Sequence, residues 1–252
     1  MTGTARTRRA ADLLLQARAT RSPLRTLPAD ARPQSTDEAY AIQDLVIAAL
    51  GPIGAWKVGA KTPSAEPNCA PLCATWRVDA PARFAAGTFR LNGIEAELAF
   101  TLDRDLPARD RRYGRQEAVE AVASVHTAIE VVDSRFADIG EVDALSLLAD
   151  SNSHGALVVG PGVPLSASFA VIDQVVELDS DGVRLASGRD ANPAGDPFRL
   201  LAWLANHAAQ RGGGLRRGQA VTTGSWTGLR FVQPGARVSA RFPGVGEAVV
   251  HL

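Results

Sequence analysis

The pattern of hydrophobic and polar positions changes at about residue 54. Before it, residues 5–20 and 36–50 carry apolar residues at helical spacing, and a Ser/Thr cap with an acidic first turn opens the second segment. After it, short apolar runs separated by Gly, Pro and Asp predict strands. The predicted strands are 54–60, 93–102, 127–136, 155–160, 171–188 (with an Asp-Gly hairpin turn), 219–226, 236–242 and 247–252. Three later helices are predicted at 114–126, 141–150 and 197–211. We therefore expect an α+β protein with a helical N-terminal part, residues 1–53, and a strand-dominated domain, residues 54–252.

The strand predicted from "GIEAELAFTL" holds two carboxylates on one face. Side chains alternate along a strand, so Glu95 and Glu97 point the same way, away from the face of Ile94. A third acid, Glu130, lies in the apolar run "TAIEVVDSRF". Buried carboxylates are costly unless a cation or basic groups satisfy them. A solvated edge strand explains the Glu-x-Glu pair about as well, but the set of three favours a hard divalent ion, Mg²⁺ or Mn²⁺.

The composition excludes several partners. Lys plus Arg and Asp plus Glu each number 27, so no net field attracts nucleic acid or anionic lipid. No apolar run approaches the roughly 18 residues of a membrane span, and no signal peptide is recognisable, so a cytoplasmic location is expected. Cys69 and Cys73 have neither the spacing nor a nearby His for zinc, and we interpret them as free thiols.

Lysine is confined to one short segment. Of the 27 basic residues only Lys57 and Lys61, both in "AWKVGAKT", are lysines. Arg cannot give up its proton in a protein, whereas burial can lower the pKa of a Lys amine into the working range. Chance placement of two lysines is the alternative, and Lys57, with the more apolar flanks, is the better candidate for proton transfer.

Several blocks resemble one family in the same order. "AWKVGA", "GIEAELAFTLDRDLP", "AIEVVDSRFAD", "LADSNSHGALVVG" and "GSWTG" are similar to the blocks of the 2-keto-4-pentenoate hydratase and 4-oxalocrotonate decarboxylase group of the fumarylacetoacetate hydrolase superfamily. The resemblance runs from about residue 36 to the C-terminus. It implies a mixed β roll of the fumarylacetoacetate hydrolase C-terminal type around Mg²⁺ or Mn²⁺, in homo-oligomers built on dimers.

The resemblance also assigns roles to residues. It places the three metal-binding carboxylates on Glu95, Glu97 and Glu130, and the active-site lysine on Lys57. It further implies a substrate-binding set that consists of Lys61, Ser153, Ser225 and Thr227. Of these, Thr227 and the nearby Ser225 are expected close to the substrate carboxylate. A strand-end turn chosen for its small residues is the alternative for Ser225 and Thr227.

The sequence departs from the family around the expected reaction centre. Hydratases of this group usually carry an acid in a segment that is shortened here to "AEPNCAPLC", with Asn68 or Cys69 in its place. Lys61 stands where Thr is usual, and Ser151 where Asn is expected. These changes affect the prediction of the reaction more than they affect the resemblance to the family.

We therefore expect a metal-dependent lyase of aromatic catabolism. A 2-hydroxy-2,4-dienoate would ketonise, and water would add to give a 4-hydroxy-2-oxo acid, with Lys57 as proton shuttle or oxyanion partner. Decarboxylation of 2-oxo-3-hexenedioate (4-oxalocrotonate) shares the enolate and stays open. Acylpyruvate hydrolysis would need a base, and neither His126 nor His154 belongs to a recognisable dyad. A non-catalytic binding protein and a pathway partner enzyme that receives the unstable dienol are further possibilities.

Overall fold

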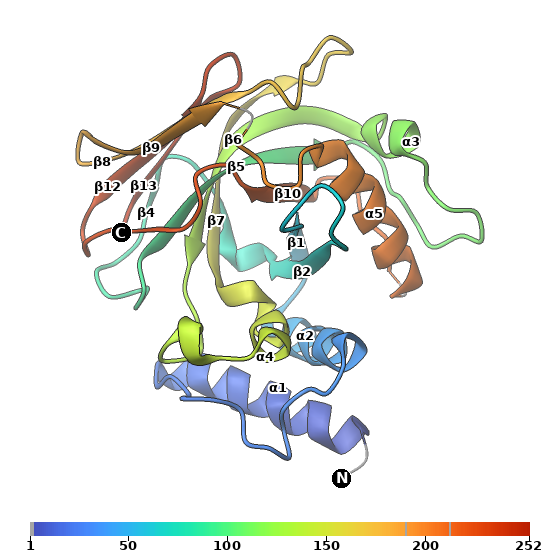
Figure 1. The fold of residues 1–252 in the computed structure, drawn as a ribbon, viewed down its shortest axis with the longest axis vertical. Helices are drawn as coiled ribbons and strands as arrows, with labels where there is room; N and C mark the ends of the chain where they lie inside the picture. Colours follow the sequence, from blue (N-terminus) through green and yellow to red (C-terminus); the bar gives the residue numbers. More distant parts are fainter. Residues whose placement is uncertain (1–2, 190, 212) are drawn as a thin grey trace.

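The computed structural model describes residues 3–189, 191–211 and 213–252, which form two β-sheets with helices at one end and along one side (Figure 1). The strands are β1 (Ile53–Gly59), β2 (Asn68–Cys73), β3 (Arg77–Asp79), β4 (Ala82–Arg83), β5 (Gly93–Leu102), β6 (Val122–Val132), β7 (His154–Pro164), β8 (Val175–Ser180), β9 (Val183–Arg189), β10 (Ala220–Ser225), β11 (Arg230–Phe231), β12 (Arg237–Phe242) and β13 (Gly246–His251). The larger sheet has the order β2-β1-β10-β5-β6-β7-β3, with β11 paired to β5, and the smaller has the order β4-β13-β12-β8-β9. The expected α+β architecture is confirmed.

In Figure 1 the two helices nearest the N-terminus and the one before β7 lie below the larger sheet, and the other two lie at its right-hand side. They are α1 (Gly3–Thr20), α2 (Thr36–Leu50), α3 (Arg115–Val119), α4 (Ala144–Ala149) and α5 (Pro197–Gln210), with 3-10 turns η1 (Ala74–Trp76), η2 (Ile139–Glu141) and η3 (Ser151–Ser153). The Ser35 hydroxyl caps α2 by accepting a hydrogen bond from the Glu38 amide at 3.2 Å. Helix α2 packs between α1 and α4, whereas α5 lies on β10 and β1. Among the helices of the described residues, none combines the length and the hydrophobicity of a membrane span.

The structure differs from the predicted elements at β6 and β2, and it contains the short strands β3, β4 and β11, which were not predicted. The helix predicted over 114–126 ends at Val119, and β6 begins at Val122. The prediction of helix beyond Val119 is wrong because residues 122–126 pair with β5, and this tertiary pairing overrides helix propensity. Strand β2 was not predicted, since Pro71 interrupts its pattern; the strand tolerates Pro71 because it lies at the edge of the sheet.

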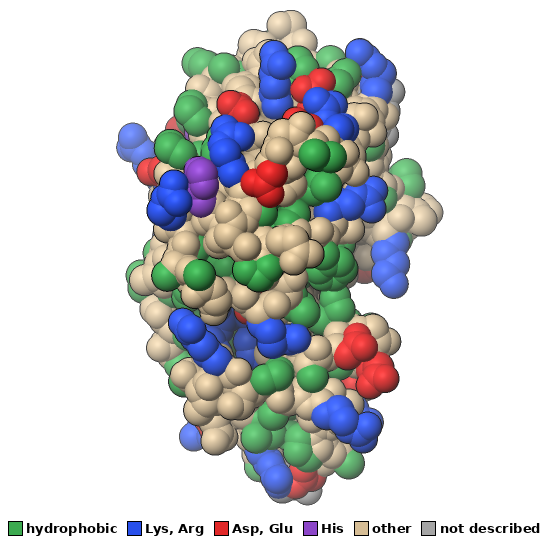
Figure 2. Space-filling model, turned by 90° about the vertical axis from the view of Figure 1, so that its left-hand side faces the viewer, with side chains coloured by type: hydrophobic (Ala, Val, Ile, Leu, Met, Phe, Trp, Pro, Cys, Tyr) green, Lys and Arg blue, Asp and Glu red, His purple; other side chains and the backbone are tan. Residues whose placement is uncertain are grey.

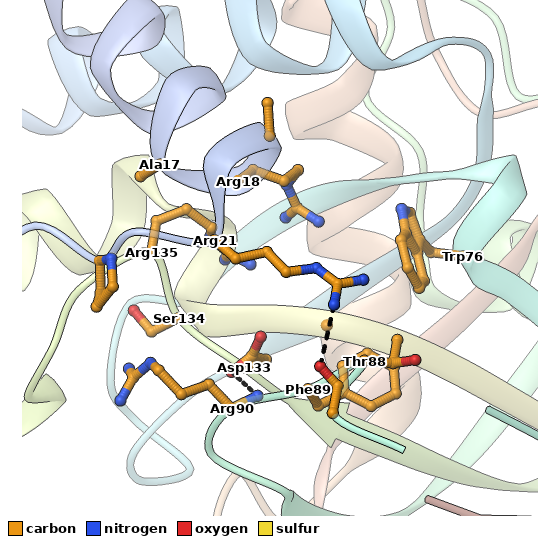
Figure 3. Close-up of a pocket in the computed structure, with 14 residues that line it drawn as sticks. Ala17, Arg18, Arg21, Trp76, Thr88, Phe89, Arg90, Asp133, Ser134 and Arg135 are labelled. Carbon is orange, nitrogen blue, oxygen red and sulfur yellow. Dashed lines mark hydrogen bonds between the residues drawn. The ribbon is translucent and has the colours of Figure 1, made fainter. Parts of the chain in front are cut away.

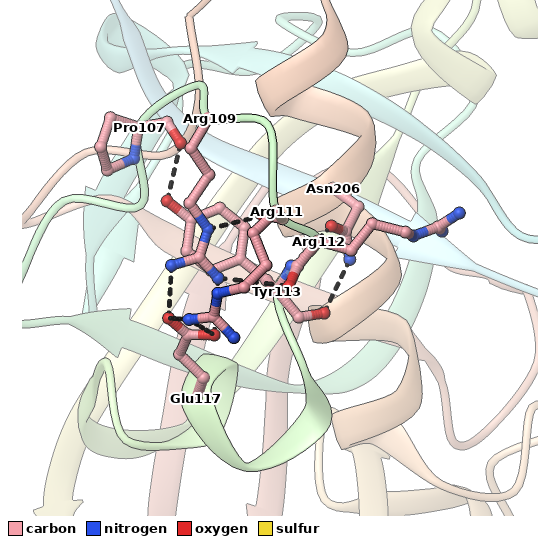
Figure 4. A network of polar contacts seen from close by, with 7 residues as sticks. All are labelled: Pro107, Arg109, Arg111, Arg112, Tyr113, Glu117 and Asn206. Carbon is pink, nitrogen blue, oxygen red and sulfur yellow. Dashed lines mark hydrogen bonds and ion pairs between the residues drawn. The ribbon is translucent and has the colours of Figure 1, made fainter.

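The segment between β5 and α3 projects beside α5 and is fastened by a polar network (Figure 4). The Arg109 guanidinium lies over the Tyr113 ring, 3.4 Å from its centroid, and its Nη2 donates to Glu117 Oε2 at 2.6 Å. The Tyr113 amide donates to Asn206 Oδ1 on α5 at 2.8 Å. This network holds the arginine-rich segment against the body of the protein.

The larger sheet curls, and the curl brings distant strands together. Strands β1 and β6 are separated by β10 and β5, which in a flat sheet places them roughly 14 Å apart. In the structure Lys57 Nζ on β1 lies 2.6 Å from Glu130 Oε1 on β6. Small side chains allow this approach: the inner face beside Lys57 carries a buried cluster that consists of Ala55, Leu72, Ala99, Ala128, Leu157, Val159 and Ala220.

Candidate metal centre

The three glutamates singled out in the sequence meet on the inner face of the curled sheet. Glu95 lies directly opposite Glu130 in the β5–β6 register, and Glu97 follows two residues along β5 on the same face. One carboxylate oxygen from each residue lies within 4.8 Å of those of the other two. Glu97 and Glu130 are only 2% and 1% exposed. Like charges placed opposite each other in a sheet are destabilising, so the group requires compensation.

Part of the compensation comes from Lys57 and His154. Lys57 Nζ donates to Glu130 Oε1 at 2.6 Å and to the Asn152 carbonyl oxygen at 3.3 Å. The buried His154 ring places Nδ1 3.1 Å from the same Glu130 oxygen, so Nδ1 is the donor there. The other Glu130 oxygen, Oε2, is buried without a hydrogen-bond partner in the described residues. A buried carboxylate oxygen without a donor has the environment of a cation ligand.

The charges shift one another's pKa values. Burial, and then repulsion from Glu130, raise the pKa of both Glu95 and Glu97 above the ordinary range. Burial opposes the Glu130 charge too, but Lys57 and His154 outweigh it and lower the Glu130 pKa. Burial lowers the pKa of His154, which keeps the ring neutral.

Lys57 differs from the expectation drawn from its sequence context. Burial alone would lower its pKa, but attraction to Glu130, Glu95 and Glu97 raises the pKa above the ordinary value. The expected lowering is therefore wrong for the metal-free protein, because the apolar flanks of Lys57 do not reveal three carboxylates on other strands. In this charge arrangement Lys57 is a fixed ammonium.

A strained turn carries Asn152 to the site. Ser151, Asn152 and Ser153 have φ angles of 53°, 49° and 60°, the left-handed region that is unfavourable for residues other than glycine by roughly 1–2 kcal/mol each. The turn directs the Asn152 carbonyl to Lys57 and ends at His154, whose ring reaches Glu130. A strained backbone conformation of this kind persists only where contacts with the surrounding structure hold it in place.

An ion pair between Asp150 and Arg135 holds the residues on both sides of this turn in place. Both side chains are buried; the Arg135 Nε donates to Asp150 Oδ1, and its Nη1 donates to the His154 carbonyl oxygen at 2.8 Å. Asp150 Oδ2 also accepts from the Ser134 hydroxyl at 2.8 Å and from the Arg135 amide at 3.0 Å. The backbone on both sides of the left-handed turn is thus held by one ion pair.

The carboxylates open into a small cavity of about 100 Å³. Its lining residues are Lys57, Val58, Gly59, Asn68, Glu95, Glu97, Asn152, Gly224 and Ser225. Asn152 Nδ2 donates to Asn68 Oδ1 at 2.8 Å, so an amide pair forms part of the wall. The Gly224 amide donates to Glu97 Oε2 at 3.2 Å and orients that carboxylate.

The predicted substrate-binding residues occupy different environments. Ser225 lines the cavity, whereas Lys61, Ser153 and Thr227 are not among its lining residues. The buried Thr227 hydroxyl accepts from the Ala96 amide at 3.1 Å and donates to the Gly228 carbonyl at 3.2 Å, which fastens the turn after β10 to β5. Ser153 is buried in the left-handed turn, and Lys61 is exposed in the loop after β1.

Sequence reasoning did not identify Asn152, Gly224 and His154 as parts of this site. The sequence shows His154 in no recognisable dyad, and in the structure its ring contacts Glu130. The position of His154 directly after an unusual "DSNS" run was the one available signal. Gly224 contacts Glu97 through its backbone amide, which every residue except proline has, so the residue type gives no signal of this contact.

The residues present fit a hard divalent cation. Three carboxylates face one ammonium and one neutral imidazole, which leaves about two negative charges when all three acids are ionised. All the converging ligand atoms are oxygens, the donor type that Mg²⁺ and Mn²⁺ prefer.

The chain is similar in sequence to proteins that are named hydratases. A 2-keto-4-pentenoate hydratase from Burkholderia vietnamiensis is 32% identical over 154 residues, which cover 61% of this chain and 58% of that protein. The match thus spans somewhat over half the length of that relative. The TodF product hydratase of Pseudomonas putida is 28% identical over 261 residues, covering 97% of this chain and 95% of that protein.

A solved structure shares the fold over nearly the whole chain. The 4-oxalocrotonate decarboxylase from Pseudomonas putida G7, complexed with magnesium and adipate, superposes with a TM-score of 0.86 at 22% identity and covers 99% of this chain and 98% of that chain. The sequence model described as fumarylacetoacetate (FAA) hydrolase C-terminal matches residues 50–252. The chain therefore belongs to the fumarylacetoacetate hydrolase C-terminal family.

Proposed function

We propose that the chain is a divalent-metal-dependent lyase that acts on 2-hydroxy-2,4-dienoates and 2-oxo acids, with water addition as in 2-keto-4-pentenoate hydratase. The observation that carries the proposal is the convergence of Glu95, Glu97 and Glu130 on a buried point beside Lys57. The relatives named hydratases support the reaction type.

The three glutamates would hold Mg²⁺ or Mn²⁺, and magnesium in the related decarboxylase structure supports this choice. When bound, the ion supplies positive charge that stabilises an enolate and a site where a 2-oxo acid is oriented. Glu95, Glu97 and Glu130 raise the Lys57 pKa, and with their charge offset by a bound cation the Lys57 amine would lie closer to the range needed for proton transfer. Lys57 is then placed to move a proton at the substrate.

The cavity wall favours a short substrate with one carboxylate. Its volume is about 100 Å³, and Lys57 is the one cationic residue that lines it among the residues the structure describes. A dicarboxylate such as 2-oxo-3-hexenedioate carries a second charge that this wall leaves without a cation. The dienoate substrate of a hydratase has an uncharged tail, and Ser225 at the cavity wall carries a hydroxyl that can donate to its carboxylate.

One observation favours decarboxylation as the second candidate. Asn68 lies at the wall where hydratases of this group usually carry an acid, and its Oδ1 already accepts from Asn152. An amide orients water but does not take its proton. Loss of CO₂ needs the enolate stabilisation and no attacking water, so Asn68 is compatible with that reaction.

An assay with two substrates separates the candidates. The purified protein with Mg²⁺ is given 2-hydroxypenta-2,4-dienoate and 2-oxo-3-hexenedioate, and water addition and CO₂ release are followed separately. Turnover of the first substrate, lost in EDTA and in Glu97→Gln but kept in the surface variant Glu247→Gln, is expected. Turnover that survives both EDTA and Glu97→Gln would refute a metal-dependent reaction at this site. The homo-oligomer built on dimers, the pathway partner enzyme and the cytoplasmic location stay predictions.

A further inference from the structure

A second and larger cavity, of about 580 Å³, lies at the C-terminal end of α1 (Figure 3). Its walls come from the end of α1, η1, the segment 87–90 and the turn after β6, and it shares no lining residue with the carboxylate cavity. Figure 2 shows a hollow below the middle of this side of the molecule, with basic side chains beside it. A volume of this size lies within the range of small-molecule sites.

The lining is basic. The charged residues around the cavity are Arg18, Arg21, Arg90, Arg135 and Asp133. The Asp133 carboxylate is already used, because its Oδ1 accepts from the amides of Arg90 and Leu91 at 3.1 and 3.0 Å. Arg135 is paired with Asp150, and the Arg90 guanidinium donates to the carbonyl oxygens of residues 136 and 137. The guanidinium groups whose donors remain available to a ligand are therefore those of Arg18 and Arg21.

These two guanidinium groups are weakly held. Arg18 Nη2 is 3.4 Å from the His154 carbonyl oxygen, and Arg21 Nη1 is 3.4 Å from the Gly87 carbonyl oxygen. Neither forms an ion pair with a carboxylate in the part of the chain that the structure describes. Burial and the neighbouring Arg135 lower the pKa of Arg18 to about 10, so this cation lies where an added negative charge is favourable. Figure 3 shows both groups extending toward the side of the cavity formed by Trp76.

An apolar wall faces the guanidinium groups. Trp76 and Phe89 both line the cavity, with their ring centroids 6.0 Å apart in an edge arrangement, and Pro23 adds to this surface. A guanidinium binds a carboxylate through two parallel hydrogen bonds, and aromatic side chains provide a flat apolar surface for a planar ligand. The combination fits a molecule with a charged end and a planar body better than it fits an inorganic anion.

We propose that this cavity binds a small organic carboxylate with a planar apolar body, such as an aromatic or conjugated acid, at a site separate from the glutamates. Arg18 and Arg21 bind the carboxylate, and Trp76 with Phe89 contacts the body. The proposal depends on no metal and goes beyond the proposed lyase reaction.

Calorimetric titration of the full chain in EDTA tests the proposal. Benzoate is the probe, benzamide is its uncharged counterpart, and phosphate is the inorganic anion. One benzoate per chain is expected, with benzamide binding at least tenfold more weakly. Arg18→Gln and Arg21→Gln should each weaken benzoate binding at least tenfold. Arg8→Gln, an exposed arginine on the same helix, and Glu97→Gln should leave it unchanged.

Several outcomes would overturn the proposal. Absence of saturable benzoate binding would do so, as would benzamide or phosphate binding as tightly as benzoate. Loss of binding in Glu97→Gln would place the ligand at the glutamates instead. A molecular mass that rises with protein concentration in the wild-type chain but not in Arg21→Gln would assign the cavity to a second copy of the chain. Because Arg21 is exposed, its variant remains informative if Arg18→Gln fails to fold.

Discussion

Replacement of Glu97 by Gln should have opposite effects on stability with and without a divalent ion. Glu97 is buried, and its carboxylate lies with those of Glu95 and Glu130 inside a 4.8 Å group. Without an ion the three acids repel one another, and burial and this repulsion raise the Glu97 pKa. Gln keeps the shape and an oxygen that accepts from the Gly224 amide, but it removes one charge.

The magnitude follows from the separation of the charges. Two unit charges 4.8 Å apart repel by about 3 kcal/mol at an effective dielectric constant of about 20. Partial protonation reduces this repulsion in the wild-type protein, so the variant should gain about 1–3 kcal/mol without metal. For a chain of this size, that gain raises the Tm by about 2–12 °C. Metal at one hundred times its Kd stabilises the wild-type protein by about 2.7 kcal/mol, or about 5–11 °C, and should stabilise the variant far less.

Thermal unfolding in EDTA and in excess Mg²⁺ measures both effects. We expect Glu97→Gln to have the higher Tm in EDTA and the smaller Tm increase in Mg²⁺. Glu247→Gln changes an exposed glutamate of β13 in the same way and should match the wild-type protein in both conditions. Equal Mg²⁺-induced increases in Glu97→Gln and the wild-type protein, together with a lower variant Tm in EDTA, would refute both the repulsion and the ligand role.

Three further predictions concern other residues. Lys57→Arg keeps a cation beside Glu130 but cannot release a proton, so kcat should fall by about 10²–10⁴-fold while the Mg²⁺-induced Tm increase persists; full activity would exclude proton transfer by Lys57. Asp150→Asn leaves the buried Arg135 without its carboxylate and should lower the free energy of unfolding in urea by about 3–5 kcal/mol; a loss under 1 kcal/mol would contradict the role of this ion pair. Burial lowers the pKa of His207 to about 4 from an ordinary value near 6.5, so the unfolded chain binds the proton first and stability is lost as the pH falls from about 6.5 toward 4; His207→Gln should remove this part of the pH dependence, and an unchanged urea-unfolding profile would disprove it.

The sequence predicts elements well where the signal is local. Strand β5 has the bounds that its alternating pattern predicts, and α2 begins after its Ser35 cap. The extension of β6 over residues 122–126 was not predictable, because these residues continue the helical pattern of the segment before them. Non-local hydrogen bonds to β5 and β7 decide between the two structures.

The candidate site was predictable in its acids but not in its surroundings. Glu95 and Glu97 are recognisable because carboxylates interrupt an apolar strand. The contacts of Lys57 with Asn152, and of Asn152 with Asn68, depend on the curl of the sheet, which brings the turn before β7 to the edge strand β2. No local pattern encodes that curl, so the raised Lys57 pKa could not be foreseen.

The four alanines of the inner face have a consequence for how this family can diversify. Ala55, Ala99, Ala128 and Ala220 contribute only methyl groups beneath the glutamates, so at these four positions only glycine is smaller. Any larger residue would push the strands apart and separate Lys57 from Glu130. Room for longer substrates is therefore more easily created at the wall formed by Gly59 and Asn68 than at these four alanines.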